Sequence, residues 1–335
     1  MSGAQKSFWK KSPAVWPLAG LGLLAVVNLI FSKNFFAISK LDGHYFGPII
    51  DVFKEGSICM VLALGMTLVI ATGGIDLSVG SVMAIVGAVA ATMLQNGHPL
   101  PVVLAASLGV GFFCGLVNGL LVCWARIQPI VATLVLMVAG RGIAQVISNG
   151  QQVQIFNKDF IFLGNGFLGG LPFSPILVSI LYLLVWLGLR RSAVGLFIEA
   201  TGDNETASRF AGLATSRVRC LAYIVSGLCA AVAGLLAASF ISDADPLTAG
   251  QNLELDAIFA VVIGGTALSG GRFILLGSFL GAILLQTLTI TMNFVGVSSA
   301  VAPVPKAVLI IVVCLLQSET TRRWLGGLWK KGASA

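Results

Sequence analysis

Charged side chains are scarce in this chain of 335 residues: Asp, Glu, Lys and Arg together make up 10%. An ordinary soluble domain carries about 25%. Hydrophobic residues reach 57%, and 40 glycines add further positions without a polar side chain. This composition excludes a chain built from soluble domains, because too few polar residues remain to cover them. It favours an integral membrane protein, in which each spanning helix needs about 20 mostly apolar residues.

Motifs that would let the chain do chemistry by itself are also absent. It has no G-x-x-x-x-G-K segment followed by Ser or Thr, and no His, Cys and carboxylate cluster at metal-binding spacing. The six cysteines fall within apolar runs without a C-x-x-C pair, so neither a disulfide framework nor a zinc site is predicted. No serine has an evident base beside it, as a catalytic serine needs. We therefore expect no catalytic site, cofactor or metal in this chain.

Ten apolar runs are separated by polar or Gly/Pro-rich breaks, and each predicts a membrane-spanning helix. The expected fold is all-α, with about ten transmembrane helices in one membrane domain, 14–317. A tail precedes it at 1–13 and another follows at 318–335. The runs cover 14–31, 48–72, 79–94, 101–124, 129–148, 174–189, 218–241, 254–268, 273–295 and 300–317.

The basic residues predict how the chain is oriented in the membrane. With the N-terminus in the cytoplasm, 14 of the 20 Lys and Arg residues fall on the cytoplasmic side and 4 on the other, while Arg141 and Lys306 lie inside spans. This distribution satisfies the positive-inside rule. We therefore expect a multi-pass protein with both termini cytoplasmic. The net charge of +7 then reflects topology, and no nucleic-acid partner is predicted.

Two polar segments stand out from the spans. The longest on the cytoplasmic side, 190–217, is too short to be a domain, and its part from 203 to 214 predicts a short capped amphipathic helix suited to docking a partner. On the other side, 150–172 predicts an interfacial loop or partial helix.

A helix break with two possible roles precedes the third span. Gly73 and Gly74 interrupt the chain there, and Asp76 and Ser78 follow. Asp76 could cap the start of the span by accepting backbone N–H groups. Alternatively, a broken helix at 72–80 lines the pathway, and Asp76 or Ser78 touches solute, as broken helices do in many transporters.

Other candidate residues lie near the eighth span. Glu254 and Asp256 are either solvated at the start of that span or part of the pathway. Gly264 and Gly265 begin a segment similar to 73–80, which is either a faint internal repeat or a chance match. Arg141 and Lys306 lie inside their spans, where each either pairs with an acid or faces water; a structural ion pair is the favoured role for both.

Three segments together resemble one family: GGIDLSVGSVMAIVGA (73–88), ATGDNETASRFAGL (200–213) and LELDAIFAVVIGGTALSGG (253–271). They are similar to the membrane permeases of ABC sugar importers, the ribose/xylose/arabinose/galactose group. DGHYFGPIIDVF (42–53) and VAGRGIAQVISNGQ (138–151) most resemble the galactofuranose-type permease. The resemblance fades after residue 292, where the polar positions of a ribose-type member are missing.

The resemblance implies a type II-like importer permease in a bacterial inner membrane, moving a monosaccharide such as galactofuranose, arabinose or a related pentose or hexose by alternating access. Its partners would be cytoplasmic ATPase subunits that bind ATP and Mg, a second permease in a homo- or heterodimer, a periplasmic sugar-binding protein and membrane lipid. Asp203 and Ser208 depart from the family pattern. The residues expected to couple to the ATPase are Gly202, Asn204, Glu205, Ala207, Arg209, Ala211 and Gly212.

Two alternatives remain: a proton-coupled sugar carrier and a membrane enzyme acting on a lipid-linked sugar. A proton-driven carrier more often has a carboxylate near the middle of a span, whereas every candidate acid here lies near a span end. The ATP-driven importer is therefore the preferred prediction.

Overall fold

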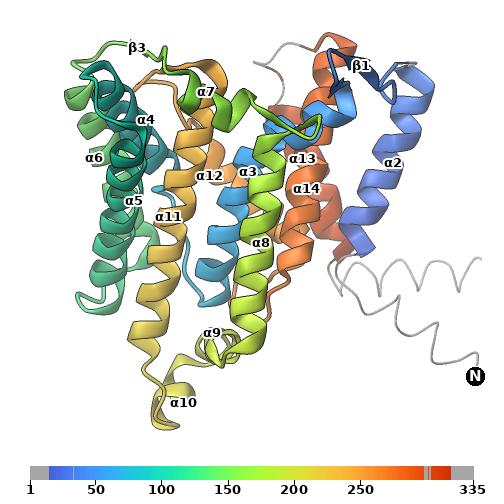
Figure 1. The fold of residues 1–335 in the computed structure, drawn as a ribbon. Helices are drawn as coiled ribbons and strands as arrows, with labels where there is room; N and C mark the ends of the chain where they lie inside the picture. The colour runs from blue at the N-terminus through green and yellow to red at the C-terminus, as the bar shows by residue number, and fades with distance from the viewer. Residues whose placement is uncertain (1–14, 33, 298–300, 302, 318–335) are drawn as a thin grey trace, which may run out of the picture.

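A computed structural model of the protein describes residues 15–32, 34–297, 301 and 303–317. Every predicted apolar run contains a helix, so the all-α membrane fold is confirmed (Figure 1). The predicted tails, 1–13 and 318–335, lie outside the described residues. The helices are α2 (Val15–Phe31), α3 (Pro48–Ala71), α4 (Val79–Gln95), α5 (Leu100–Cys123), α6 (Pro129–Ile147), α8 (Phe173–Arg191), α11 (Thr215–Ile241), α12 (Leu253–Ile263), α13 (Leu275–Val295) and α14 (Pro303–Gln317).

The helices differ in length. Among the described residues, α3, α5, α6, α8, α11 and α13 are long and apolar enough to cross a membrane, and α2 and α4 are shorter apolar helices. The run expected to span at 254–268 is different: α12 has only 11 residues and ends at Ile263. At 1.5 Å per residue it covers about 16 Å, roughly half of the hydrocarbon core. The rest of that run turns back toward α13.

Short elements connect the helices at both ends of the bundle. One end of the bundle, here called the hairpin end, carries α7 (Lys158–Asn165) and three two-stranded antiparallel strand pairs (Figure 1). Helix α7 confirms the partial helix expected within 150–172. The opposite end, here the α10 end, carries α9 (Val194–Asp203) and α10 (Glu205–Phe210). The strand pairs are β1 (Ser39–Leu41) with β2 (His44–Phe46), β3 (Val153–Gln154) with β6 (Asp243–Ala244), and β4 (Phe167–Leu168) with β5 (Leu171–Pro172).

Helices α3 and α11 form the centre of the bundle, and α11 packs against α3, α4 and α5. Small residues allow the closest approach. Gly111 on α5 and Gly227 on α11 face each other, and a Cβ on either would collide with the carbonyl oxygen of the other. Membrane helices commonly pack through such glycines, because van der Waals contact replaces the hydrophobic effect there.

A buried polar cluster fixes the segment between α3 and α4. Asp76 is 1% exposed, and its carboxylate accepts hydrogen bonds from the backbone N–H of Ser78 (3.0 Å), the Ser78 hydroxyl (2.6 Å) and the Ser226 hydroxyl on α11 (2.7 Å). Asn118 on α5 donates to Ser78 Oγ at 2.8 Å. One buried carboxylate thus ties the start of α4 to two other helices. It accepts a backbone N–H there, as a capping residue would.

Removing the Ser226 hydroxyl tests this cluster. Because removing one partner of a buried hydrogen bond costs about 1–3 kcal/mol, Ser226→Ala should lower the thermal unfolding midpoint in detergent. Asp76→Asn should lower it further, since an amide would present N–H groups to donors. The control is Ser179→Ala, which removes an exposed hydroxyl bonded only to Pro175 O of its own helix. Equal midpoints for Ser226→Ala and Ser179→Ala would show that the cluster does not stabilise the fold.

Candidate coupling and transport site

Three chain segments meet backbone to backbone at the α10 end, in a contact that we name the glycine junction: Ala71, Gly202, Gly270 and Gly271. Gly271 N–H donates to Ala71 O at 2.9 Å. A Cβ on Gly202 would collide with Ala71 O, and one on Gly270 would lie 2.9 Å from Gly202 O. The end of α3, the end of α9 and the turn after α12 are therefore in direct main-chain contact.

The two similar Gly-Gly segments are neighbours at this junction. A Cβ on Gly270 would lie 2.9 Å from Gly73 N, and Gly73 and Gly265 both have left-handed φ angles, 78° and 89°. Gly264 packs against the backbone of Gly277 on α13. The breaks predicted at 73–74 and 264–265 are thus both real turns, and both lie at the α10 end.

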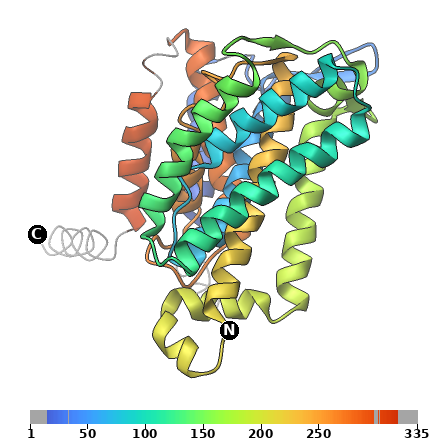
Figure 2. The same ribbon diagram turned by 90° about the vertical axis from the view of Figure 1, so that its left-hand side faces the viewer.

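The α9–α10 segment projects beyond the helix ends (Figures 1 and 2). A helix was expected from Asp203, but α10 begins at Glu205 and its cap is Asn204, whose Oδ1 accepts the Ala207 N–H at 2.9 Å. Asn204 is the residue whose short side chain reaches the third helical N–H. The predicted coupling residues lie on α9, on α10, at the cap between them or in the turn between α10 and α11: Gly202, Asn204, Glu205, Ala207, Arg209, Ala211 and Gly212.

Helix α10 combines a firm attachment with an exposed apolar tip. Glu205 Oε2 pairs with Arg219 Nη1 of α11 at 2.8 Å, and Ser208 Oγ donates to Ala200 O of α9 at 2.7 Å. Phe210 is 89% exposed, and Arg209 beside it is exposed as well. A large exposed aromatic side chain next to an unpaired cation is typical of a docking surface.

A second close contact lies inside the bundle, where the first turns of α4 and α12 meet; we name it the broken-helix junction. Gly80 and Gly250 touch backbone to backbone, and a Cβ on Gly80 would lie 2.5 Å from Glu254 Oε2. Glu254 is only 8% exposed, and its Oε2 has no hydrogen-bond partner among the described residues. Solvation of Glu254 at the start of a span is therefore the wrong interpretation. Its carboxyl group lies in the first turn of α12, inside the bundle.

The two basic residues inside the spans behave differently. Lys306 forms the predicted ion pair, with Asp256 Oδ2 at 2.8 Å. Arg141 has no carboxylate within ion-pair distance among the described residues, so the ion pair expected for it is wrong. Its Nη1 donates to the carbonyl oxygen of Ala249 instead, which holds the non-helical segment before α12.

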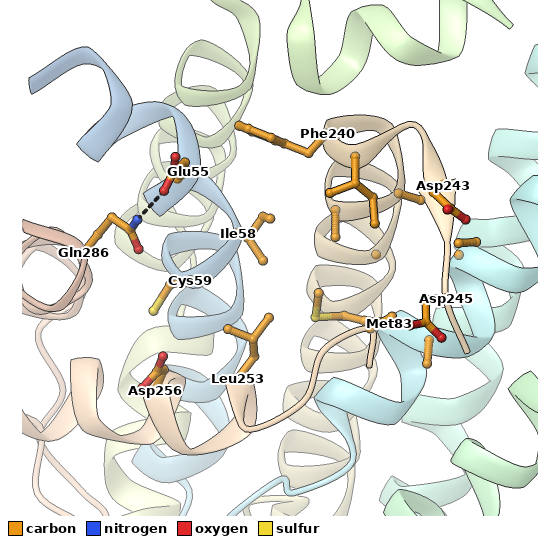
Figure 3. A pocket seen from close by; sticks show the side chains of 18 of the residues that line it. Glu55, Ile58, Cys59, Met83, Phe240, Asp243, Asp245, Leu253, Asp256 and Gln286 are labelled. Carbon is orange, nitrogen blue, oxygen red and sulfur yellow. Dashed lines mark hydrogen bonds between the residues drawn. The ribbon is translucent and has the colours of Figure 1, made fainter. Parts of the chain in front are cut away.

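A cavity of about 320 Å³ lies between α3, α4, α11, α12 and α13 (Figure 3). Most of its wall is apolar. In Figure 3, Glu55 and Gln286 lie on one side, joined by a hydrogen bond of 3.0 Å, with Asp243 and Asp245 opposite and Asp256 near the foot. An apolar wall with a few hydrogen-bonding groups is typical of a small-molecule site, and the volume lies within the usual range.

Asp245 keeps its charge at the cavity edge. Partial burial acts to raise the pKa of its carboxyl, but hydrogen bonds from Thr248 Oγ1 (2.5 Å) and Leu247 N–H (2.9 Å) outweigh burial, so the pKa lies below its usual value. Sequence analysis missed Asp243, Asp245 and Gln286 as cavity residues. The acidic pair just after a long apolar run was the available signal for the first two.

Comparison with known proteins supplies the family. Residues 49–316 match the family described as branched-chain amino acid transport system / permease component. The galactofuranose transporter permease protein YtfT of Escherichia coli is 46% identical over 91% of this chain and 91% of its own length. The fructose import permease protein FruF of Bifidobacterium longum is 39% identical over 96% and 92%, and the ribose import permease protein RbsC of Bacillus subtilis 36% over 90% and 92%. No solved structure matches.

These matches confirm the resemblance drawn from the three segments, since each relative is a permease and aligns over almost its whole length. A membrane permease also agrees with the structure, whose described residues include helices long and apolar enough to cross a membrane. The chain therefore belongs to the family of membrane permease components of ABC transport systems.

Proposed function

We propose that this chain imports a monosaccharide across the bacterial inner membrane as one subunit of an ATP-driven transporter. The sequence has no nucleotide-binding motif, so separate ATPase subunits would bind ATP and Mg and hydrolyse the ATP. A periplasmic sugar-binding protein would deliver the solute, and a second permease would complete the pathway as a homo- or heterodimer. Both termini would then be cytoplasmic. The names of the relatives support a sugar, because galactofuranose, fructose and ribose are all monosaccharides.

The glycine junction is the observation that carries this proposal. The ATPase would dock on Arg209 and Phe210 of α10. Its movement would reach α11 through the Glu205–Arg219 pair, and would reach α3 and the 264–271 turn through Gly202. Main-chain contacts transmit such a displacement better than flexible side chains, because neither partner can relax by changing a rotamer.

The same helices carry the polar groups of the cavity. Glu55 lies on α3, which ends at the glycine junction, and Asp256 lies on α12, whose following turn forms the junction's other side. A push at Gly202 would therefore shift the cavity wall. We infer that the solute occupies this cavity on its way through, with carboxylates and Gln286 accepting or donating hydrogen bonds to its hydroxyl groups. Alternating access follows from these joined elements.

Reconstitution tests the proposed function directly. The chain, inserted into liposomes with its ATPase subunits, second permease and binding protein, should take up a labelled pentose or hexose only when ATP and the binding protein are present. A panel of sugars would identify the solute. The proton-coupled alternative draws on buried Glu254 and predicts uptake driven by an imposed proton gradient without ATP. That result would overturn the proposal.

Gly202→Ala should uncouple the transporter. Its Cβ would collide with Ala71 O, so the α9 end must move away from α3. Uptake should fall at least about tenfold, which needs only about 1.4 kcal/mol, while ATP hydrolysis falls less. The matched control is Gly188→Ala on α8, where no atom lies within 4 Å of the added Cβ. Sugar taken up per ATP hydrolysed is the measurement, and an unchanged ratio in Gly202→Ala would remove the coupling role.

Gly87→Leu should block the cavity. Gly87 lines it, and the nearest atoms to an added Cβ are Ala238 Cβ and Ala244 Cβ, both at 3.8 Å, so a Cβ is accommodated and the larger side chain enters the open volume. Uptake should be lost while the protein inserts normally. Gly109→Leu on the exposed side of α5, with nothing within 4 Å, is the control. Full uptake by Gly87→Leu would place the pathway elsewhere.

A further inference from the structure

A second cavity, of about 550 Å³, opens at the α10 end between the end of α5, the start of α6, α10 and α11. In Figure 2 the lower ends of α5 and α6 (teal and green) lie just above α10 (yellow). This cavity differs from that of Figure 3 because most of its charged groups are basic. It is lined by Arg126, Arg209 and Arg219, and Glu205 is the one carboxylate among its lining residues.

The positive charge of this cavity is not neutralised within the described residues. Glu205 is paired with Arg219, which leaves the charges of Arg126 and Arg209 without a partner. The Nε atom of Arg219 is buried and has no hydrogen-bond partner. The cavity therefore has positive charge available to an anion.

The surroundings of the cavity match the headgroup level of a membrane. Helices α5 and α6, which form one wall, are less buried than the central helices: only 28% and 22% of their most apolar 18-residue windows are buried, against 78% for α3. Trp124, in the turn after α5, lines the cavity and is 78% exposed. Tryptophan concentrates where spans meet the interface, and Arg126 follows it in a sharp turn with φ of 55°.

We propose that this cavity binds the phosphate group of an anionic lipid headgroup. In the permease without its docked ATPase, Arg126 and Arg209 would hold the phosphate oxygens through paired N–H groups, beside the guanidinium group of Arg219. The acyl chains would lie along the exposed faces of α5 and α6. A free inorganic phosphate has the same chemistry, and the experiment separates the two sources. The acidic side chain of a docked protein is the competing occupant.

Thermal unfolding of the full chain, purified in neutral detergent without other subunits, tests the site. Phosphatidylglycerol should raise the unfolding midpoint in a saturable way, and phosphatidylcholine should not. In Arg126→Gln the concentration of phosphatidylglycerol needed for half the effect should rise about tenfold, the factor for roughly one charge-assisted hydrogen bond. Arg126→Lys should recover part of the affinity, because it restores the charge.

The control variant is Arg190→Gln. Arg190 is an exposed cation at the same end of the bundle, stacked on Trp186 and outside this cavity, so its loss should leave the lipid effect unchanged. An equal effect of Arg126→Gln and Arg190→Gln would overturn the proposal, as would an equal effect of the two lipids. The same Arg126-dependent shift with inorganic phosphate alone would identify the occupant as free phosphate rather than lipid. No lipid effect in any variant would leave a protein side chain as the occupant and overturn the lipid site.

Discussion

Backbone N–H and C=O groups inside a membrane must find partners within the protein, because lipid offers none. In this chain that constraint acts on the non-helical segments between spans. Thr133 donates to Ile75 O at 3.3 Å, Arg141 donates to Ala249 O, and Gly271 N–H donates to Ala71 O. Each break is thus closed by a group from another part of the chain, and breaks, glycine contacts and buried polar residues form one arrangement.

This arrangement explains why the polar residues lie where they do. A break that needs partners from other helices also fixes those helices relative to one another, and Asp76 does so for α4, α5 and α11. The glycine junction instead joins its segments mainly through main-chain contact, with the Gly271–Ala71 hydrogen bond as its polar link. Such a main-chain contact would pass a displacement from one segment to the next, whereas a carboxylate with several donors holds its helices in place. The proposed coupling therefore requires movement at Gly202 and a fixed point at Asp76.

The sequence was sufficient for the spans, because length and apolarity are properties of each segment alone. It did not predict that α12 ends at Ile263, because the following residues, such as Gly264, Thr266 and Ala267, are also small or apolar and continue the run. It also failed for Arg141, whose partner is a backbone carbonyl 108 residues away, a group that every residue carries and no pattern distinguishes. The family motifs at 73–88, 200–213 and 253–271 were found separately, and only the fold brings their glycines together.

The buried acids also bear on the source of energy. Asp76 accepts hydrogen bonds from Ser78 and Ser226, and Asp256 forms an ion pair with Lys306. Among the described residues, Glu254 and Asp243 each keep a buried carboxyl oxygen without a hydrogen-bond partner, and Glu254 lies in the first turn of α12. A proton carrier needs an acid that releases and regains its proton in each cycle. Asp76 and Asp256 could do so only by disturbing the contacts that hold α4, α11 and α14 in place, which agrees with the proposed motor outside this chain.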